Sequence, residues 1–183
     1  MSADDHLGAL AAQAAAGDRV ALSDLVRATQ ADVWRLCAHL VDRQSADDLT
    51  QDVYARAIGA LPRYRGDSPV RLWLLGIARH VCIDEVRKRS RRRRLRATMP
   101  EPTVTAPDPS GSVDLDDLLA RLDPDQRTAF VLTQVLGLRY AEAAEAAGVP
   151  VGTIRSRVAR AREALVDAMA DPEDDTGTGT AES

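Results

Sequence analysis

Arginine and hydroxyl side chains recur on one face of a predicted helix near the C-terminus, and such groups bind phosphates and base edges of nucleic acids. The segment YAEAAEAAGVPVGTIRSRVARAR, residues 140–162, predicts a short helix, a glycine turn and a basic second helix. Gly148 suits the left-handed end of a helix, and Pro150 suits the restart of the next. In the second helix a buried stripe is predicted at Ile154, Val158, Ala161 and Leu165. The opposite face carries Gly152, Thr153, Ser156, Arg157 and Arg160.

This pattern predicts a helix-turn-helix that reads the major groove of DNA. The alternative is an amphipathic helix whose basic face is simply solvated. The remaining charged clusters of the chain decide between these two interpretations.

A second cluster is acidic and lies on a predicted helix that Ser45 opens as its N-terminal cap and that Pro62 limits at the other end. Its polar members share one face because of their offsets of zero, one, four and five: Asp47, Asp48, Gln51 and Asp52. No histidine or further acid lies at ligand spacing nearby, so a surface for a basic partner is favoured over a metal site or an acid–base pair. The alternative is a solvated helix start, where acids are favourable because of the helix dipole.

A third cluster is basic and lies on a helix predicted to start at Ser68-Pro69, with Trp73, Ile77 and Val81 on one side. Cations surround aromatic and polar groups here: Arg71, Arg79, Arg87 and Lys88 beside Trp73, His80 and Asp84. Such a surface suits a single nucleic-acid strand, whose phosphates are neutralised and whose bases can stack. The alternatives are a core role for Trp73 and a flexible basic arm for the following arginine run.

The composition predicts an all-α protein, because 45% of the 183 residues are hydrophobic while only 3% are aromatic. The net charge of −4 hides a strong segregation: residues 87–96 include eight bases, whereas residues 171–183 carry five acids and no base. No apolar run approaches the roughly 20 residues that cross a bilayer, and the N-terminus is acidic, so we expect a cytoplasmic protein.

The order of helices and linkers predicts two small helical domains. Two helices over residues 7–40 are broken at Gly17-Asp18, and a later helix begins at Asp123-Pro124. Between the domains lies a segment rich in proline, threonine and serine, which predicts a flexible linker. The expected division is a first domain at 7–95, the linker at 96–113, a helix-turn-helix domain at 114–170 and a disordered acidic tail at 171–183.

Catalysis is not expected, since no nucleophile with a base, no paired carboxylates in an apolar pocket and no P-loop are found. Cys37-Ala38-His39 and His80-Val81-Cys82 could in principle bind zinc. Helical positions two apart diverge by about 200°, however, so neither pair can chelate together. We therefore expect no cofactor, no metal and no small-molecule substrate, with both cysteines reduced and buried.

In their order along the chain, the acidic cluster, the basic cluster and the helix-turn-helix resemble the extracytoplasmic-function sigma factors, small two-domain initiation factors of bacterial RNA polymerase. SADDLTQDVYARAI, residues 45–58, is similar to the acidic helix that docks on the polymerase clamp. RLWLLGIARHVCIDEVRKR, residues 71–89, is similar to the segment that grips and melts the minus-ten promoter element. Residues 123–165 are similar to the region whose second helix reads the minus-thirty-five element.

The resemblance implies a role for each matching residue. Residues implied to face the clamp of the β′ subunit of core RNA polymerase are Asp48, Leu49, Gln51 and Asp52. Residues implied at the minus-ten element are Trp73, Arg79, His80, Asp84, Arg87 and Lys88. Residues implied at the minus-thirty-five element are Thr153, Arg155, Ser156, Arg157 and Arg160. The loop 62–70 corresponds to the one that captures a flipped base.

Two departures from the family pattern leave the base preference open: His80 stands where asparagine is frequent, and Tyr54 where phenylalanine is frequent. The resemblance implies promoter DNA and core polymerase as partners and admits an anti-sigma factor, although no residue identifies one. The alternative function is a helix-turn-helix transcription regulator that is not a polymerase subunit. Such a regulator would need a receiver or ligand domain, and the first 95 residues show neither alternating strands nor a Gly-rich loop.

Overall fold

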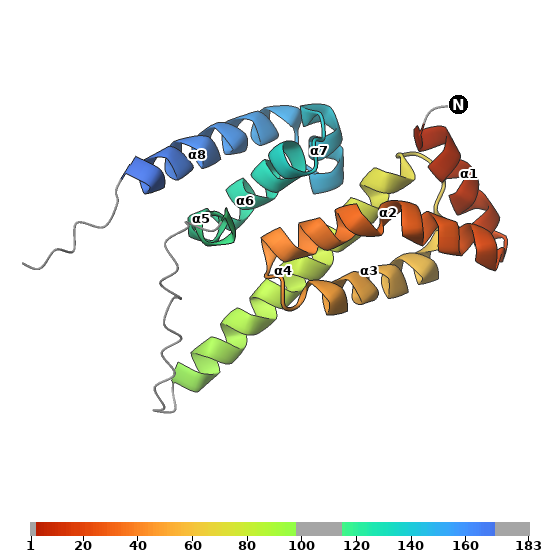
Figure 1. Ribbon diagram of the computed structural model, residues 1–183, viewed down its shortest axis with the longest axis horizontal. Coiled ribbons are helices and arrows are strands. Elements are labelled where there is room, and N and C mark those ends of the chain that lie inside the picture. Colours follow the sequence, from red (N-terminus) through yellow and green to blue (C-terminus); the bar gives the residue numbers. More distant parts are fainter. Residues whose placement is uncertain (1–2, 98–114, 171–183) are drawn as a thin grey trace, which may run out of the picture.

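The computed structural model describes residues 3–97 and 115–170, and within these two ranges every regular element is a helix (Figure 1). The first range contains α1 (Ala3–Ala15), α2 (Arg19–Leu40), α3 (Ala46–Ala60), a 3-10 turn (Leu61–Arg63) and α4 (Val70–Ala97). The second contains α5 (Leu115–Arg121), α6 (Pro124–Phe130), a π-helical turn (Val131–Val135), α7 (Tyr140–Ala147) and α8 (Val151–Ala170). The all-α prediction is confirmed. The linker and tail expected from the sequence lie outside the described residues, except that residues 96 and 97 end α4.

Several helix ends have the chemical causes that the sequence predicts. Asp18 caps α2, because its Oδ1 accepts hydrogen bonds from the backbone N–H groups of Val20 at 2.8 Å and Ala21 at 3.1 Å. Asp123 caps α6 in the same way, with Pro124 in the first turn. Gly148 ends α7 with φ 66°, the left-handed conformation that glycine adopts without a steric penalty.

The start of α3 differs from the prediction. Ser45 precedes the helix but makes no side-chain cap. Its Oγ instead accepts a hydrogen bond of 2.5 Å from Nη2 of Arg89, a residue of α4. The cap prediction for Ser45 is therefore wrong, because a guanidinium 44 residues away competes for the same hydroxyl.

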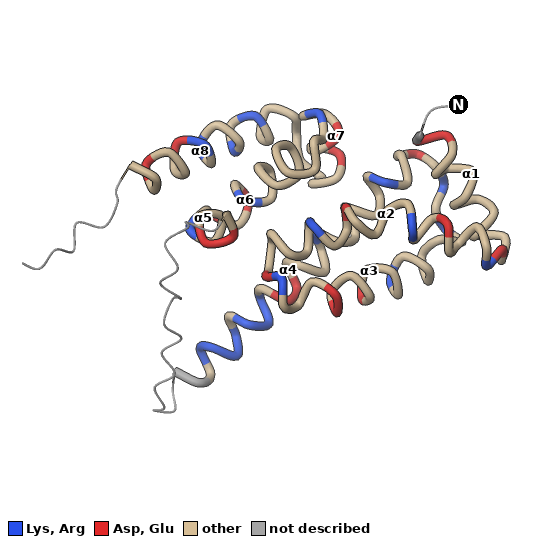
Figure 2. Tube along the Cα trace, viewed as in Figure 1, with Lys and Arg blue, Asp and Glu red and all other residues tan. Residues whose placement is uncertain are grey.

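In the first domain, helices α1 to α4 pack around a shared core, and α4 contacts each of the other three. Its centre is aliphatic, with Val33, Leu36, Val53, Leu74 and Leu75 at most 2% exposed. Burying each of these side chains stabilises the fold by about 1.5–3 kcal/mol. The long helix α4 continues beyond this core, and Figure 2 shows lysine and arginine concentrated along that extension.

In the second domain, α8 packs against α5, α6 and α7. The predicted stripe of α8 is confirmed, because Ile154, Val158, Ala161 and Leu165 are all buried. Gly137, with φ 69°, follows the π-helical turn and lets the chain reverse into α7. The turn between α7 and α8 leaves Pro150 just before α8, where its carbonyl accepts from the N–H of Thr153 at 2.9 Å.

The two domains pack against each other, chiefly through α4 and α7, and also through α2 with α6 and the π-helical turn. The helices α4 and α7 approach closely at Gly76, where a Cβ atom would lie 3.5 Å from the carbonyl oxygen of Ala146. Arg71 bridges the domains, since it pairs with Asp32 at 2.7 Å and donates to the carbonyl of Leu136 at 3.2 Å. No motif in the sequence predicts this packing.

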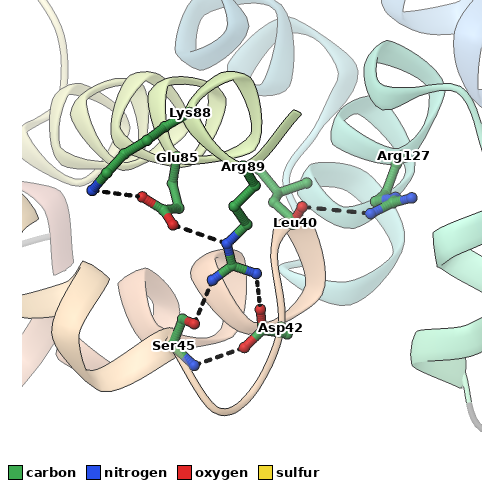
Figure 3. A network of polar contacts seen from close by, with 7 residues as sticks. All are labelled: Leu40, Asp42, Ser45, Glu85, Lys88, Arg89 and Arg127. Carbon is green, nitrogen blue, oxygen red and sulfur yellow. Dashed lines mark hydrogen bonds and ion pairs between the residues drawn. The ribbon is translucent and has the colours of Figure 1, made fainter. Parts of the chain in front are cut away.

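A second bridge between the domains involves α5. Asp116 accepts from Nε of Arg43 at 2.9 Å, and its other oxygen lies 2.7 Å from Nδ1 of His39. Both partners lie at or just after the end of α2, so this carboxylate fixes the first turn of α5 to the first domain. Arg127 of α6 donates to the carbonyl of Leu40 at 3.5 Å, as Figure 3 shows.

Candidate nucleic-acid interface

The acidic face of α3 is available to a partner. Asp48, Gln51 and Asp52 are exposed on one side of the helix, as their spacing predicts. Asp47 is also exposed, and its Oδ1 accepts a hydrogen bond of 2.8 Å from Nε1 of Trp34 on α2. Leu49 is only 6% exposed and lines the groove between α3 and α4 beside this face.

A groove of about 720 Å³ runs between α3 and α4 and joins two clusters that the sequence treats separately. Asp52 of the acidic cluster lines it together with Asp84, Arg87 and Lys88 of the basic cluster. Asp84 pairs with Arg56 of α3 at 3.2 Å across the groove. The groove therefore carries charges of both signs on one surface, with the basic residues on the α4 side.

Arg89 holds α4 against the loop that precedes α3 (Figure 3). It pairs with Asp42 and donates to Ser45 Oγ, and its Nε also pairs with Glu85 of the same helix at 2.9 Å. Burial raises the pKa of Asp42, but hydrogen bonds from Arg89 and Ser45 outweigh it and lower the pKa overall. Hydrogen bonds from Arg89 and Lys88 likewise lower the pKa of Glu85. This network fixes the entry to α3 and hence the position of its acidic face.

The predicted minus-ten residues lie on different sides of α4. Asp84, Arg87, Lys88 and His80 are exposed, and Nδ1 of His80 lies 2.7 Å from the carbonyl oxygen of Gly76. Trp73 is half-buried and packs against Tyr64, with the ring centroids 5.0 Å apart. The core alternative for Trp73 is thus supported by its packing.

Arg79 faces the second domain rather than open solvent. It lines a cavity of about 340 Å³ together with residues of α6, and its Nε is buried without a hydrogen-bond partner among the described residues. Arg87 reaches the same cavity as well as the groove beside α3. The domain packing thus places Arg79 away from the exposed His80, Asp84 and Lys88, and only Arg87 of the predicted minus-ten residues that the structure describes shares its cavity.

The basic face of α8 is largely open. Arg155, Ser156 and Arg160 are exposed, while Thr153 is half-buried at the helix start. Arg157 differs, because its side chain is 23% exposed and pairs with Asp125 of α6. A cation on the predicted reading face is therefore already engaged within the domain.

The cysteines and histidines do not assemble a metal site. Cys37 and Cys82 are buried next to each other between α2 and α4, where burial and the neighbouring thiol raise the pKa of Cys82. His39 pairs with Asp116, and His80 is exposed on α4. Over residues 3–97 and 115–170, no three His, Cys, Asp or Glu side chains are arranged to hold a metal ion.

No helix in the same ranges is long and apolar enough to span a membrane.

Two helical domains, with a basic helix-turn-helix in one and adjoining acidic and basic surfaces in the other, are typical of a DNA-binding protein. The sequence matches the family described as Sigma-70 region 2 over residues 25–92 and that described as Sigma-70, region 4 over residues 112–165. These two matches fall on the two domains of the structure.

Comparison with similar proteins supports the match to the Sigma-70 family. The chain is 51% identical over 181 residues to the ECF RNA polymerase sigma factor SigC of Mycobacterium tuberculosis, covering 96% of this chain and 97% of SigC. It resembles the solved structure of CnrH in complex with the cytosolic domain of CnrY, with a TM-score of 0.69, 27% identity and coverage of 89% and 96%. It also resembles the sigma factor RpoE of Bartonella quintana in complex with the anti-sigma factor NepR, with a TM-score of 0.67, 28% identity and coverage of 81% and 96%.

The chain belongs to the extracytoplasmic-function sigma factors. It is accordingly a sigma factor that acts in promoter recognition and transcription initiation.

Proposed function

We propose that the two domains divide promoter recognition, with residues 7–95 binding core RNA polymerase and the minus-ten element and residues 114–170 binding the minus-thirty-five element. The observation that carries this proposal is the separation of exposed charge: acids on α3, bases on α4 and bases on α8 (Figure 2). One acidic and two basic surfaces on three helices suit one protein partner and two stretches of DNA.

The polymerase surface is the exposed face of α3. The exposed face presents carboxylates and an amide to basic groups on the clamp of the β′ subunit, from Asp48, Gln51 and Asp52. The opposite charges attract each other and guide the association of the two proteins. Leu49 supports this face from the core and does not itself contact the polymerase.

The minus-ten surface is the exposed side of α4. Arg87 and Lys88 neutralise phosphates, and His80 and Asp84 offer polar groups to the bases. The loop 62–70 receives the flipped base, and Trp73 anchors this loop through its contact with Tyr64. Arg79 joins the surface only when the second domain moves away from α4.

The minus-thirty-five surface is the outer face of α8. Arg155, Ser156 and Arg160 reach the major groove, and Thr153, near the start of α8, contacts the sugar-phosphate backbone of the DNA. Arg157 contributes once it leaves Asp125. Each surface alone binds weakly, and the polymerase raises the effective concentration of the second contact by holding both domains.

The protein performs no catalysis and uses binding energy to hold melted DNA that the polymerase transcribes. Unstacking costs a few kcal/mol per base, which phosphate and pocket contacts offset. We also infer that it acts in the cytoplasm and is restrained by an anti-sigma factor, as RpoE is bound by NepR in its solved complex.

Run-off transcription from a genomic fragment pool, with core polymerase from the same organism, tests this proposal. Discrete new starts that share two spaced upstream motifs are expected. A stable complex with core polymerase but no new starts would contradict promoter selection by this chain alone. No complex with core polymerase would favour the plain helix-turn-helix regulator.

The assignment of surfaces is tested by charge reversal. Asp52→Lys is expected to weaken binding to core polymerase at least about tenfold, because like charges across an interface cost several kcal/mol. Asp4→Lys is the matched control, since Asp4 is an exposed carboxylate on α1, away from the acidic face. Equal binding by both variants would refute the role of α3.

A further inference from the structure

A cavity of about 340 Å³ lies between α4 of the first domain and α6 of the second, and it carries an unusual set of charges. Arg79 and Arg87 line it from α4, and Arg127 lines it from α6. Asp125 is the sole acid among the described residues that line the cavity, and it already pairs with Arg157. The three arginines that line the cavity therefore outnumber its one carboxylate, which is paired with Arg157.

Two of these guanidinium groups are incompletely hydrogen-bonded. The Nε atoms of Arg79 and Arg127 are buried and have no hydrogen-bond partner among the described residues. The other nitrogens of Arg127 donate only to neutral backbone carbonyls, those of Leu40 at 3.5 Å and Ala120 at 2.7 Å. Burial accordingly lowers the pKa of Arg127. Buried charged donors without an acceptor are unfavourable, so an anion at this position would satisfy them.

The rest of the cavity wall is apolar. Leu40, Cys82, Ile83 and Val86 line it from the first domain, and Pro124 lines it from the second. A volume of about 340 Å³ falls at the small end of the roughly 300–1,000 Å³ typical of small-molecule sites. Apolar walls with a few convergent polar groups are also the usual composition of such sites.

We propose that this cavity binds a small amphipathic carboxylate, whose anionic head is held by Arg79, Arg87 and Arg127 and whose apolar body lies against Ile83 and Val86. The carboxylate accepts from planar guanidinium groups, which match its geometry. The molecule is a ligand and not a substrate, because nothing in the cavity is arranged to react with it.

Such a ligand would regulate the sigma factor. It contacts both domains and therefore stabilises their packed arrangement by mass action. It also occupies Arg79 and Arg87, which we assign to the minus-ten element. This consequence rests on the proposed function of α4 and predicts that carboxylate and promoter DNA compete.

Binding is tested on the full chain without polymerase or DNA, with octanoate as the probe. We expect octanoate to bind once per chain by calorimetry and to shift the Nε–H resonances of Arg79 and Arg127 in ¹H–¹⁵N spectra. Acetate lacks the apolar body and 1-octanol lacks the charge, so each is expected to bind at least about tenfold more weakly. Equal shifts from acetate, or no shift from octanoate, would overturn the proposal.

A variant at the cavity wall checks the location. Val86 is 39% exposed and lies outside the residues assigned to DNA, so Val86→Glu is expected to keep the fold while placing a charge against the apolar body of a ligand that is itself anionic. Octanoate binding is expected to fall at least about tenfold. Leu95→Glu is the control, because Leu95 is 71% exposed on the same helix and does not line the cavity. Equal binding by Val86→Glu and the original chain would place the ligand elsewhere.

The regulatory consequence is measured separately, by competition between octanoate and a single strand carrying the minus-ten element. Octanoate is expected to raise the apparent Kd for the strand in the original chain but not in Val86→Glu. Binding of octanoate without competition would overturn the regulation and leave the site. Failure of the binding test would leave the sigma-factor assignment intact, because transcription assays do not depend on the ligand.

Discussion

The ion pair between Arg157 and Asp125 places a restraint on promoter reading that a single substitution can remove. Arg157 lies on the predicted reading face of α8, but its guanidinium is engaged with a carboxylate of α6. Contact between Arg157 and DNA therefore requires that this pair break first. Asp125→Asn is expected to raise the affinity for the minus-thirty-five element, because it releases the guanidinium.

The magnitude follows from the exposure of the two side chains, 23% for Arg157 and 49% for Asp125. An ion pair that water reaches to this extent contributes about 0.2–1 kcal/mol. Since 1.4 kcal/mol corresponds to a factor of ten, the expected gain is up to about fivefold in Kd. The helix start is preserved, because α6 is capped by Asp123.

The assay is fluorescence anisotropy of holoenzyme on a duplex that carries the minus-thirty-five element. A double-mutant cycle with Arg157→Ala isolates the coupling between the two residues. Asp167→Asn serves as the control for nonspecific repulsion, because Asp167 is an exposed carboxylate on α8 itself. If Asp125→Asn raises affinity equally with and without Arg157, the carboxylate acts only by repelling DNA and the reasoning is refuted.

Three further predictions concern the contacts that position the surfaces. Arg89→Met should destabilise the first domain by up to about 1 kcal/mol in thermal melting, since it removes a partly exposed ion pair with Asp42 that Arg92→Met, an exposed control, leaves in place. Because the pKa of Asp42 is lowered in the folded state, the stability that its carboxylate contributes is fully present above pH 3.8, its ordinary pKa, and is lost as the pH falls through the folded-state pKa. Arg89→Met should therefore reduce the loss of stability over this acidic range. Asp116→Ala should increase the radius of gyration in X-ray scattering, whereas Asp117→Ala, at an exposed neighbour, should not.

Most of the secondary structure could be predicted from the sequence, because its signals are local. The caps Asp18 and Asp123 act on backbone groups two and three residues away, and Gly148 acts through its own φ. Ser45 failed as a cap for the opposite reason, since its hydroxyl is bonded to Arg89 from another helix. The resemblance places Leu49 on the polymerase surface, and the structure adds that its helical face turns toward the core and leaves it only 6% exposed.

The domain packing could not be predicted, because it depends on single contacts between residues far apart in the chain. Gly76 shows no periodicity that would mark it as a close approach to α7, and Asp116 looks like any acid in the first turn of a helix. The motifs that identify the family describe each domain alone. The contacts of Asp116 with His39 and Arg43 exist only when both domains are present in one structure.

Counting arginines in the sequence therefore overstates the charge available to DNA. Arg89 is committed to carboxylates within the first domain, Arg71 and Arg127 bridge the two domains, and Arg157 is paired within the second. Arg160, by contrast, is exposed on α8. The guanidinium groups of the bridging arginines are free to bind other partners only when the domains separate. A movement of the domains would therefore change both the number and the position of the cations that meet the promoter. We therefore expect the affinity of this sigma factor for DNA to depend on its domain arrangement as well as on its sequence.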